Sequence, residues 1–368
     1  MNTCKRILCV FALLFLVTCG VLTIVVPDRE FSEDENRYLK QNPEISVKGI
    51  LEGDYQEEIK EYFADQVIFR DDFMRLYAMA QKGMGKSEYN NIYLCDDNWL
   101  IEVYNEPVKT EWITEKFAEV TEYTDANCML MLAPTAISIY DEVLPSGVSG
   151  TDKQAEVRDY IYANAGMDTI DVWSALEENK DEVQLYYKTD HHWTTDAAYI
   201  AYEAFCEHQG FTPVAKEEFE KVDVSTEFYG TIYSKALTAF QPADTITAYK
   251  QDMTGITVTY AAGEGSLYSD EYLEKKDKYA YFLNGNQAMI TIENSNVDND
   301  KILLVVKDSY ANCFVPFLVN HYEKIVVLDT RYYRMGVSTT AEDIEATDIL
   351  FLFNLNTLDT DTAIAGIY

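Results

Sequence analysis

The chain has 368 residues, of which 48% are hydrophobic and 13% aromatic. That composition supplies ample apolar surface for a buried core and argues against a globally disordered chain. The 63 acidic residues outnumber the 29 basic ones and give a net charge of −34 at pH 7. A surface this acidic repels phosphate, which argues against nucleic-acid binding and against flat adsorption onto anionic lipid.

The N-terminus predicts a membrane segment. Residues 7–26 carry no charge and follow a short basic stretch. A run of that length spans a hydrocarbon core as a helix, and the basic flank predicts that the N-terminus stays inside. No small-x-small cleavage site follows, so we favour an uncleaved anchor. A cleaved signal peptide and a lipidated Cys19 are the alternatives. We therefore expect an anchor or signal segment at 1–27 and an extracytoplasmic domain at 28–368, with secreted or lipid-anchored forms as the other two cases.

The first half of the chain mixes helical and strand patterns. Residues 28–42 are charged and predict a loop, whereas apolar residues recur at helical spacing over 49–85. Residues 91–103 predict a short strand pair with a turn at 96–98. The elements expected next are a helix at 110–124, a buried parallel strand at 128–132, a helix at 153–165, a short strand at 167–172 and a helical turn at 173–179.

The second half begins with a capped helix. Thr194 or Thr195 can cap a helix over 196–208, which Gly210 ends. Residues 211–300 alternate like strands, and we interpret them as a β-rich insertion or lobe. Its expected strands are 222–234, 245–249, 256–260, 279–283 and 289–292. The tail returns to a strand at 301–306, a helix at 310–320, a strand at 324–328, a helix at 340–346 and a strand at 348–353.

Strand–helix alternation of this kind implies a parallel sheet with helices on both faces. The expected fold class is therefore α/β, with three α/β/α layers, the β-rich insertion at about 211–300 and an N-terminal transmembrane helix. No internal repeat and no low-complexity tract interrupts it.

Ser309 lies where an expected strand passes into an expected helix. Sites in open α/β sheets lie at the carboxyl ends of the strands, so a serine here would expose its hydroxyl at that edge. The helix expected at 310–320 would offer backbone N–H groups to an oxyanion. No Gly-x-Ser-x-Gly elbow surrounds the serine, and the alternative is that Ser309 only caps the helix.

Asp190 and His192 are two residues apart, in a motif that holds two of the 4 histidines. That spacing allows a carboxylate–imidazole hydrogen bond in a turn, which would orient the imidazole and stabilise its cation during proton transfer. A structural histidine pair and a metal site are the alternatives. The 7 cysteines have no CxxC spacing, and HExxH is absent, so we expect no metal and no cofactor. Disulfides cannot be assigned from the sequence.

The Asp190-His191-His192-Trp193 sequence resembles the motif for which the DHHW protein family is named. Its members are extracytoplasmic proteins, mostly of Gram-positive bacteria, and are similar to periplasmic alginate O-acetylation proteins, whose fold is a permuted SGNH hydrolase. Further stretches resemble the family pattern over nearly the whole chain beyond residue 28. They are 29–37, Phe63 and Asp65 with Phe69-Arg70, 134–140, 228–231 with Ser234-Lys235, and 307–310. Two positions differ: Lys307 stands where the SGNH pattern often has Gly, and Thr135 where relatives often have Lys.

The resemblance implies an SGNH hydrolase-like fold with Ser309 as nucleophile and with Asp190 and His192 as its catalytic pair. His192 would take the serine proton while Asp190 orients the ring. Further candidates for contacts with the oxyanion or the substrate are Gly230, Asn354, Tyr310, His191, Trp193 and Tyr229. Gly230 and Asn354 would support the Ser309 N–H at the oxyanion, and the aromatic residues would stack on sugar rings unless they pack in the core.

The expected function is an extracytoplasmic O-acetyltransferase that modifies a cell-surface or secreted polysaccharide through an acetyl-serine intermediate. Water as the acceptor would make the protein an acetylesterase instead. A non-catalytic polysaccharide-binding or assembly protein is the alternative of another class. By analogy with the alginate system, a membrane-bound partner would supply the acyl group.

Overall fold

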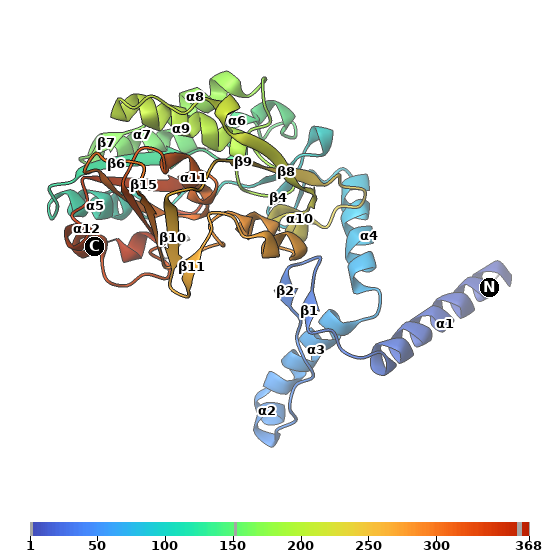
Figure 1. Cartoon of the computed structure of the whole chain (residues 1–368). Coiled ribbons are helices and arrows are strands. Elements are labelled where there is room, and N and C mark those ends of the chain that lie inside the picture. Colours follow the sequence, from blue (N-terminus) through green and yellow to red (C-terminus); the bar gives the residue numbers. More distant parts are fainter. Residues whose placement is uncertain (1–2, 151–152, 359–362, 368) are drawn as a thin grey trace. The chain divides into compact units, whose positions relative to one another are not determined.

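The structure is a computed structural model that describes residues 3–150, 153–358 and 363–367. The chain divides into two compact units (Figure 1). The first contains residues 1–89 and 233–241, and the second contains residues 90–232 and 242–368. All of the site residues predicted from the sequence lie in the second unit.

The first unit is mainly helical. Within its first helix, Cys4–Val25 is long and apolar enough to cross a membrane, a property that a signal sequence shares. A short antiparallel hairpin occupies part of the segment predicted as a loop. The elements are α1 (Thr3–Val25), β1 (Phe31–Ser32), β2 (Arg37–Tyr38), α2 (Val47–Glu52), α3 (Asp54–Gln66), α4 (Arg70–Gly83) and β3 (Glu88–Tyr89).

The helical run predicted at 49–85 is three helices, because the backbone turns left-handed at two residues. Gly53 has φ 94° and Phe69 has φ 60°, and a helix of L-residues cannot continue through such a conformation. Few apolar side chains are buried in these helices. Four arginines instead pair with carboxylates of the same unit: Arg29 with Asp71, Arg37 with Asp65, Arg70 with Glu35, and Arg75 with Asp34.

The second unit is built on an eight-stranded sheet in the order β11-β10-β12-β14-β13-β15-β6-β7. The strands from β14 to β7 are parallel, as predicted, and they are β14 (Lys324–Leu328), β13 (Ile302–Lys307), β15 (Asp348–Asn354), β6 (Asn127–Ala133) and β7 (Asp168–Thr169). Every residue of β15 is buried, as is typical of a parallel strand covered on both faces.

Two apolar clusters lie on opposite faces of this sheet, and helices contribute side chains to each. In β6, Met129 and Met131 join one cluster, while Leu130 and Leu132 join the other, because successive side chains of a strand point to opposite faces. The first cluster includes side chains of α8 (Val172–Asn179), α9 (Thr195–Gln209) and α11 (Val315–Leu318). The second includes those of α5 (Thr110–Thr121), α7 (Gln154–Asn164) and α12 (Val337–Asp343).

Part of the segment predicted as a β-rich insertion or lobe belongs to the main sheet. β10 (Ile256–Tyr260), β11 (Gly263–Gly265) and β12 (Met289–Asn294) extend the main sheet, and β12 pairs antiparallel with β14. The sheet is therefore mixed, whereas we had predicted it to be parallel. The remaining strands of the segment, β8 (Glu220–Phe228) and β9 (Asp244–Lys250), pair with each other in a two-stranded sheet.

Three further predictions were wrong. The strand predicted at 279–283 is a 3-10 turn, Lys278–Tyr281, and the strand predicted at 222–234 ends at Phe228, before α10 (Thr231–Ala236). The helix predicted at 310–320 is a 3-10 turn, Ser309–Asn312, followed by the single turn of α11. Pro316 lies in that turn, and its ring and missing N–H prevent a helix from running through it.

Other predictions were confirmed. The strand pair is β4 (Ile92–Leu94) and β5 (Leu100–Glu102), joined by a turn at Asp96–Asn98. Thr194 caps α9 by accepting from the Ala197 N–H, and Gly210 ends the helix in a left-handed conformation. Two features lie outside those predictions: the helix α6 (Ala136–Ile139) follows β6, and all seven cysteines are unpaired.

Candidate active site

Asp190, His192 and Ser309 form a continuous chain of hydrogen bonds. The His192 Nδ1 lies 2.5 Å from the Asp190 Oδ1, and the His192 Nε2 lies 2.7 Å from the Ser309 Oγ. Asp190 is 3% exposed and His192 6%, whereas Ser309 is half-buried. Residues that are 117 positions apart in the chain thus meet in the geometry of a nucleophile, a base and an orienting carboxylate.

The Ser309 turn is fixed at the carboxyl end of the sheet. Asp308, the first residue after β13, accepts from the Tyr310 N–H at 2.9 Å through Oδ1. Its Oδ2 accepts from the backbone N–H and the side-chain amide of Asn354, each at 2.7 Å. Since Asn354 ends β15, this carboxylate ties the serine turn to the neighbouring strand.

The Asp190 carboxylate is held from both sides. Its Oδ1 accepts from the His192 N–H at 3.0 Å, and its Oδ2 accepts from the Thr231 N–H at 2.7 Å and the Thr231 hydroxyl at 3.0 Å. A Cβ at Gly230 would lie 2.2 Å from Asp190 Oδ2. Gly230 therefore allows the 228–231 segment to approach the carboxylate.

A second buried carboxylate, Asp244 of β9, holds the residues just before the motif. It accepts from the Thr189 N–H at 2.7 Å, the Thr189 hydroxyl at 2.6 Å and the Lys188 N–H at 3.0 Å. The Thr189 hydroxyl oxygen in turn accepts from the Gly230 N–H at 3.2 Å. Asp244 and Thr189 thus connect the two segments that surround Asp190.

The electrostatics favour a neutral His192 and an ionised Asp190. Burial, followed by the neighbouring His191, lowers the pKa of His192 to about 4. Burial alone would raise the pKa of Asp190, but the two adjacent imidazoles and the hydrogen bonds to the carboxylate lower it well below its usual range. A neutral His192 with its proton on Nδ1 directs the lone pair of Nε2 at the serine, as a general base requires.

Tyr279 covers the imidazole and was not predicted as a site residue. Its ring stacks on His192 with centroids 3.7 Å apart and planes 14° apart. The His191 ring lies 3.9 Å from the same imidazole, and two rings this close cannot share one face of it. Tyr279 comes from the segment mistaken for a strand, and Thr231 and Asp244 were also missed as site residues. Thr231 lies in the 228–231 stretch that resembles the family pattern, whereas nothing in the local sequence of Tyr279 or Asp244 separates them from ordinary packing residues.

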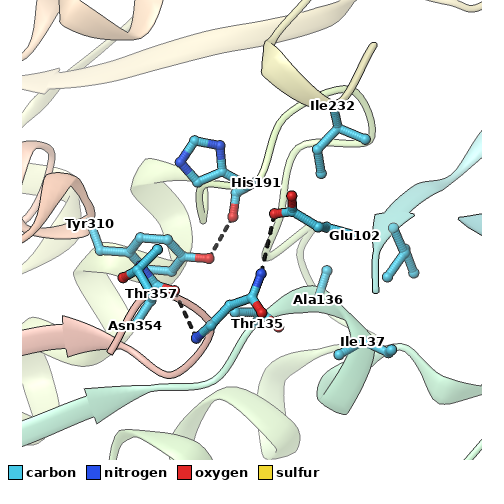
Figure 2. Close-up of a pocket in the computed structure, with 11 residues that line it drawn as sticks. Glu102, Thr135, Ala136, Ile137, His191, Ile232, Tyr310, Asn354 and Thr357 are labelled. Carbon is cyan, nitrogen blue, oxygen red and sulfur yellow. Dashed lines mark hydrogen bonds between the residues drawn. The ribbon is translucent and has the colours of Figure 1, made fainter. Parts of the chain in front are cut away.

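A small cavity adjoins the motif. Its volume is about 20 Å³, room for about one water molecule. Figure 2 shows His191, Glu102 and Asn354 around it, with the Tyr310 hydroxyl directed at the His191 carbonyl. Ile101, Ala136, Ile137 and Ile232 supply apolar walls, and the remaining lining residues are Thr135, Tyr310, Asn356 and Thr357.

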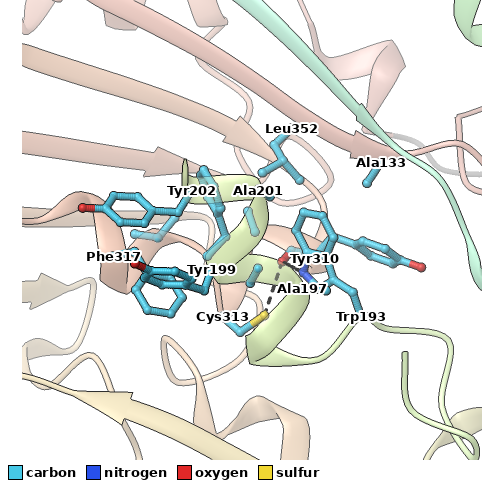
Figure 3. Packing of buried hydrophobic residues seen from close by; sticks show 14 of the residues in the cluster. Ala133, Trp193, Ala197, Tyr199, Ala201, Tyr202, Tyr310, Cys313, Phe317 and Leu352 are labelled. Atoms are coloured by element: carbon cyan, nitrogen blue, oxygen red, sulfur yellow. Dashed lines mark hydrogen bonds between the residues drawn. The ribbon is translucent and has the colours of Figure 1, made fainter. Parts of the chain in front are cut away.

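The predicted sugar-stacking residues are mostly inside the protein. Trp193 and Tyr310 are fully buried, 5.2 Å apart, and the Trp193 Nε1–H donates to the Tyr310 carbonyl. Figure 3 shows both rings packed near Ala197 and Cys313 in the core. Tyr229 is half-buried. For Trp193 and Tyr310, the structure therefore favours the core-packing alternative.

Two predicted oxyanion donors are already engaged. The Gly230 N–H donates to Thr189, and the Asn354 side-chain amide donates to Asp308 and to Thr357 at 2.9 Å. The helix expected after Ser309 is a 3-10 turn, so a helix N-terminus is not the source of N–H groups. Lys307 is fully buried, burial lowers its pKa to about 8, and its Nζ donates to Asn286 and Asn312.

Asp190, His191 and His192 are also the group of described residues closest to a metal-site arrangement, with one potential ligand atom each within 4.8 Å of the others. The His192 Nδ1 and the Asp190 Oδ1 are 2.5 Å apart, whereas two ligands about 2.0–2.2 Å from one zinc ion lie farther apart than that. The His191 Nδ1 meets the Thr231 hydroxyl at 2.7 Å. The arrangement fits a hydrogen-bonded group better than a coordinating one.

Comparison with known proteins identifies the family. A model of the DHHW protein family matches residues 78–328. The crystal structure of a DHHW family protein from Eubacterium siraeum is 25% identical, with a TM-score of 0.67 over 76% of this chain and 96% of that chain. Bacillus cereus PatB1, solved with a sulfonyl adduct, is 21% identical, with a TM-score of 0.62 over 75% of this chain and 100% of that one.

The O-acetyltransferase domain of Pseudomonas putida AlgJ is more distant, at 14% identity and a TM-score of 0.46 over 74% of this chain and 93% of that chain. No curated protein matches the chain. The family match covers more than half of the sequence, including the motif and Ser309, and the chain belongs to the DHHW protein family.

Proposed function

We propose that this protein is an O-acetyltransferase that acts on a polysaccharide outside the cytoplasm and carries the acetyl group on Ser309. The observation that supports it most strongly is the hydrogen-bond chain from Asp190 through His192 to Ser309, at 2.5 and 2.7 Å. The choice of acetyl group and of polysaccharide rests on the resemblance of DHHW proteins to alginate O-acetylation proteins. The resemblance also implies an SGNH hydrolase-like core.

In the first half-reaction, His192 Nε2 takes the Ser309 proton as Oγ bonds to the acyl carbon of an ester donor. The donor oxygen leaves with the proton that His192 returns. No hydrogen bond among the described residues engages the Ser309 N–H, which suits it to hold the oxyanion. In the second half-reaction a sugar hydroxyl attacks the acetyl carbon, its proton passes to His192, and Ser309 regains a proton as its bond to the acetyl group breaks.

The proposed location rests on the apolar helix α1. Cys4–Val25 would anchor the chain with the second unit outside the cytoplasm. Acetyl donors made in the cytoplasm would then have to be delivered across the membrane, and a membrane-bound partner fits that requirement.

The test uses the full-length protein in detergent micelles, exposed to p-nitrophenyl acetate and analysed by intact-protein mass spectrometry. Wild type should gain one acetyl group that maps to Ser309. Ser309→Ala and His192→Ala should gain none. The matched controls are Ser87→Ala and His208→Ala, which change exposed residues outside the site and should acetylate like wild type. A chelator should have no effect.

A folded wild-type protein that gains no acetyl group and releases no p-nitrophenol would refute the proposal. Equal retention of polysaccharide by wild type and Ser309→Ala would then favour a binding protein. Acetylation of Ser309 that ends only in hydrolysis, whatever sugar is added, would instead identify an esterase.

A further inference from the structure

His191, the first histidine of the motif, is tied to the same carboxylate as His192. Its Nδ1 lies 2.7 Å from the Thr231 Oγ1, and that hydroxyl lies 3.0 Å from the Asp190 Oδ2. The backbone of His191 is also fixed, because its carbonyl accepts from the Tyr310 hydroxyl at 2.5 Å. Hydrogen bonds therefore orient both the half-buried ring and the main chain of His191.

The hydrogens of this relay can be assigned from its chemistry. An ionised carboxylate only accepts hydrogen bonds, so the single Thr231 hydroxyl hydrogen points to Asp190. The Thr231 oxygen must then accept from His191, and Nδ1 carries the hydrogen. In the neutral ring the lone pair is consequently on Nε2. No hydrogen bond among the described residues occupies that atom.

Both imidazoles turn the same edge toward Asp190. The Nδ1 atoms of His192 and His191 lie 2.5 and 3.7 Å from the Asp190 Oδ1, and the two planes differ by 36°. Both Nε2 atoms therefore face away from the carboxylate. The His192 Nε2 meets Ser309, while His191 borders the cavity with Glu102 and Asn356.

We propose that His191 Nε2 accepts a hydrogen bond from a second hydroxyl of the acceptor, next to the hydroxyl that takes the acetyl group. The ligand class is a vicinal diol, as in a sugar ring. This inference rests on the proposed function and specifies how its acceptor is recognised. Water has no second hydroxyl, so the contact favours transfer over hydrolysis.

The step leaves the chemistry of the second half-reaction unchanged. The reacting hydroxyl oxygen bonds to the acetyl carbon and the Ser309 Oγ–acetyl bond breaks. The proton of the reacting hydroxyl passes through His192 to Ser309. The neighbouring hydroxyl keeps its proton and donates it in a hydrogen bond to His191, which holds the acceptor at the acetyl group.

The experiment measures how acetyl-Ser309 partitions between water and an added alcohol, using full-length protein, p-nitrophenyl acetate, and either cis-1,2-cyclohexanediol or cyclohexanol. The ratio of ester to acetate is counted per acetyl group released, so it does not depend on how much acetyl-enzyme forms. Wild type should transfer to the diol about five-fold better than to cyclohexanol, as expected for one hydrogen bond. His191→Phe should remove that preference, and His191→Gln should restore part of it.

Thr231→Val should also weaken the diol preference because it removes the group that orients His191, whereas Thr231→Ser should keep it. The control His208→Phe should match wild type. Equal transfer to diol and cyclohexanol in wild type, or an unchanged preference in His191→Phe, would overturn the inference while acetyl-Ser309 still forms. Absence of acetyl-Ser309 in wild type would instead refute the proposed function itself.

Discussion

The two segments that form the candidate site are held in different ways. Ser309 follows β13, which is hydrogen-bonded along its length to β14 and β15 and is almost entirely buried. Asp190 and His192 lie on a loop between Tyr186 and Trp193, where only a few backbone hydrogen bonds cross. Side chains hold this loop instead, chiefly Asp244 and Thr231.

Because the two segments are held differently, single substitutions in them should have different effects. A strand in the middle of a sheet keeps its position through many backbone hydrogen bonds and apolar contacts, so losing one side chain costs stability more than position. A loop held by a few buried polar contacts depends on each of them, because a lost partner leaves a buried donor unsatisfied. Substitutions in the loop should therefore reduce activity, and those in the strand should reduce stability.

Asp190→Asn should produce the largest effect. The amide cannot keep the Nδ1 hydrogen of His192 directed at a carboxylate, so the ring no longer presents its lone pair to Ser309. We expect the acetylation rate of Ser309 to fall by about 10⁴-fold, measured as p-nitrophenol release by folded protein. The exposed Asp298→Asn is the control. A loss of less than tenfold, about 1.4 kcal/mol, would mean that Asp190 does not orient the base.

Leu304→Ala tests the strand. Leu304 is fully buried in the cluster with the α5, α7 and α12 side chains. Its truncation should lower the free energy of unfolding by about 2–5 kcal/mol, measured by urea denaturation. The acetylation rate per folded molecule should not change. A fall in that rate similar to the one expected for the loop would erase the distinction between the two segments.

Asp244→Ala tests the loop without touching a reacting residue. The Lys188 and Thr189 N–H groups would lose their acceptor, which should cost about 1–3 kcal/mol in the free energy of unfolding. Displacement of the loop should also slow acetylation, by up to about 10²-fold. Asp298→Ala controls for removal of an acidic side chain. Lower stability with an unchanged rate per folded molecule would show that the loop keeps its position without Asp244.

A change of pH should have the smallest effect on the acetylation rate. The measurement tests whether the buried His192 titrates differently from a histidine with the ordinary pKa. Because burial lowers the pKa of His192 to about 4, the acetylation rate should be nearly the same at pH 5.5 and pH 7.5. A base with the ordinary pKa of about 6.5 would lose about 90% of its neutral form at pH 5.5. A tenfold loss at pH 5.5 would contradict the effect of burial on His192.

The lowered pKa of His192 also determines whether folding stability rises or falls with pH. Between pH 6.5 and 4 the unfolded chain gains a proton at His192 that the folded protein does not. Folding therefore becomes less favourable as the pH falls through that window. His192→Gln should remove this contribution from the pH dependence of unfolding.

Local patterns in the sequence were sufficient for much of the fold. The apolar runs of β6, β13, β14 and β15 predicted buried parallel strands, and Thr194 with Gly210 predicted both ends of α9. The same local reasoning singled out Asp190, His192 and Ser309. Strand burial, helix capping and the two-residue Asp–His spacing depend on neighbours in the chain, so the sequence carries them directly.

The remaining features depend on contacts between residues that are distant in the chain. Strands of the 211–300 segment belong to the main sheet because β12 pairs with β14. The local sequence of a strand does not indicate which distant strand it pairs with. Three residues of that segment contact the motif or the residue just before it from 40 to 87 residues away along the chain: Thr231, Asp244 and Tyr279. His192 and Ser309 meet although they are 117 residues apart in the chain. Strand order and packing determine which distant side chains come into contact.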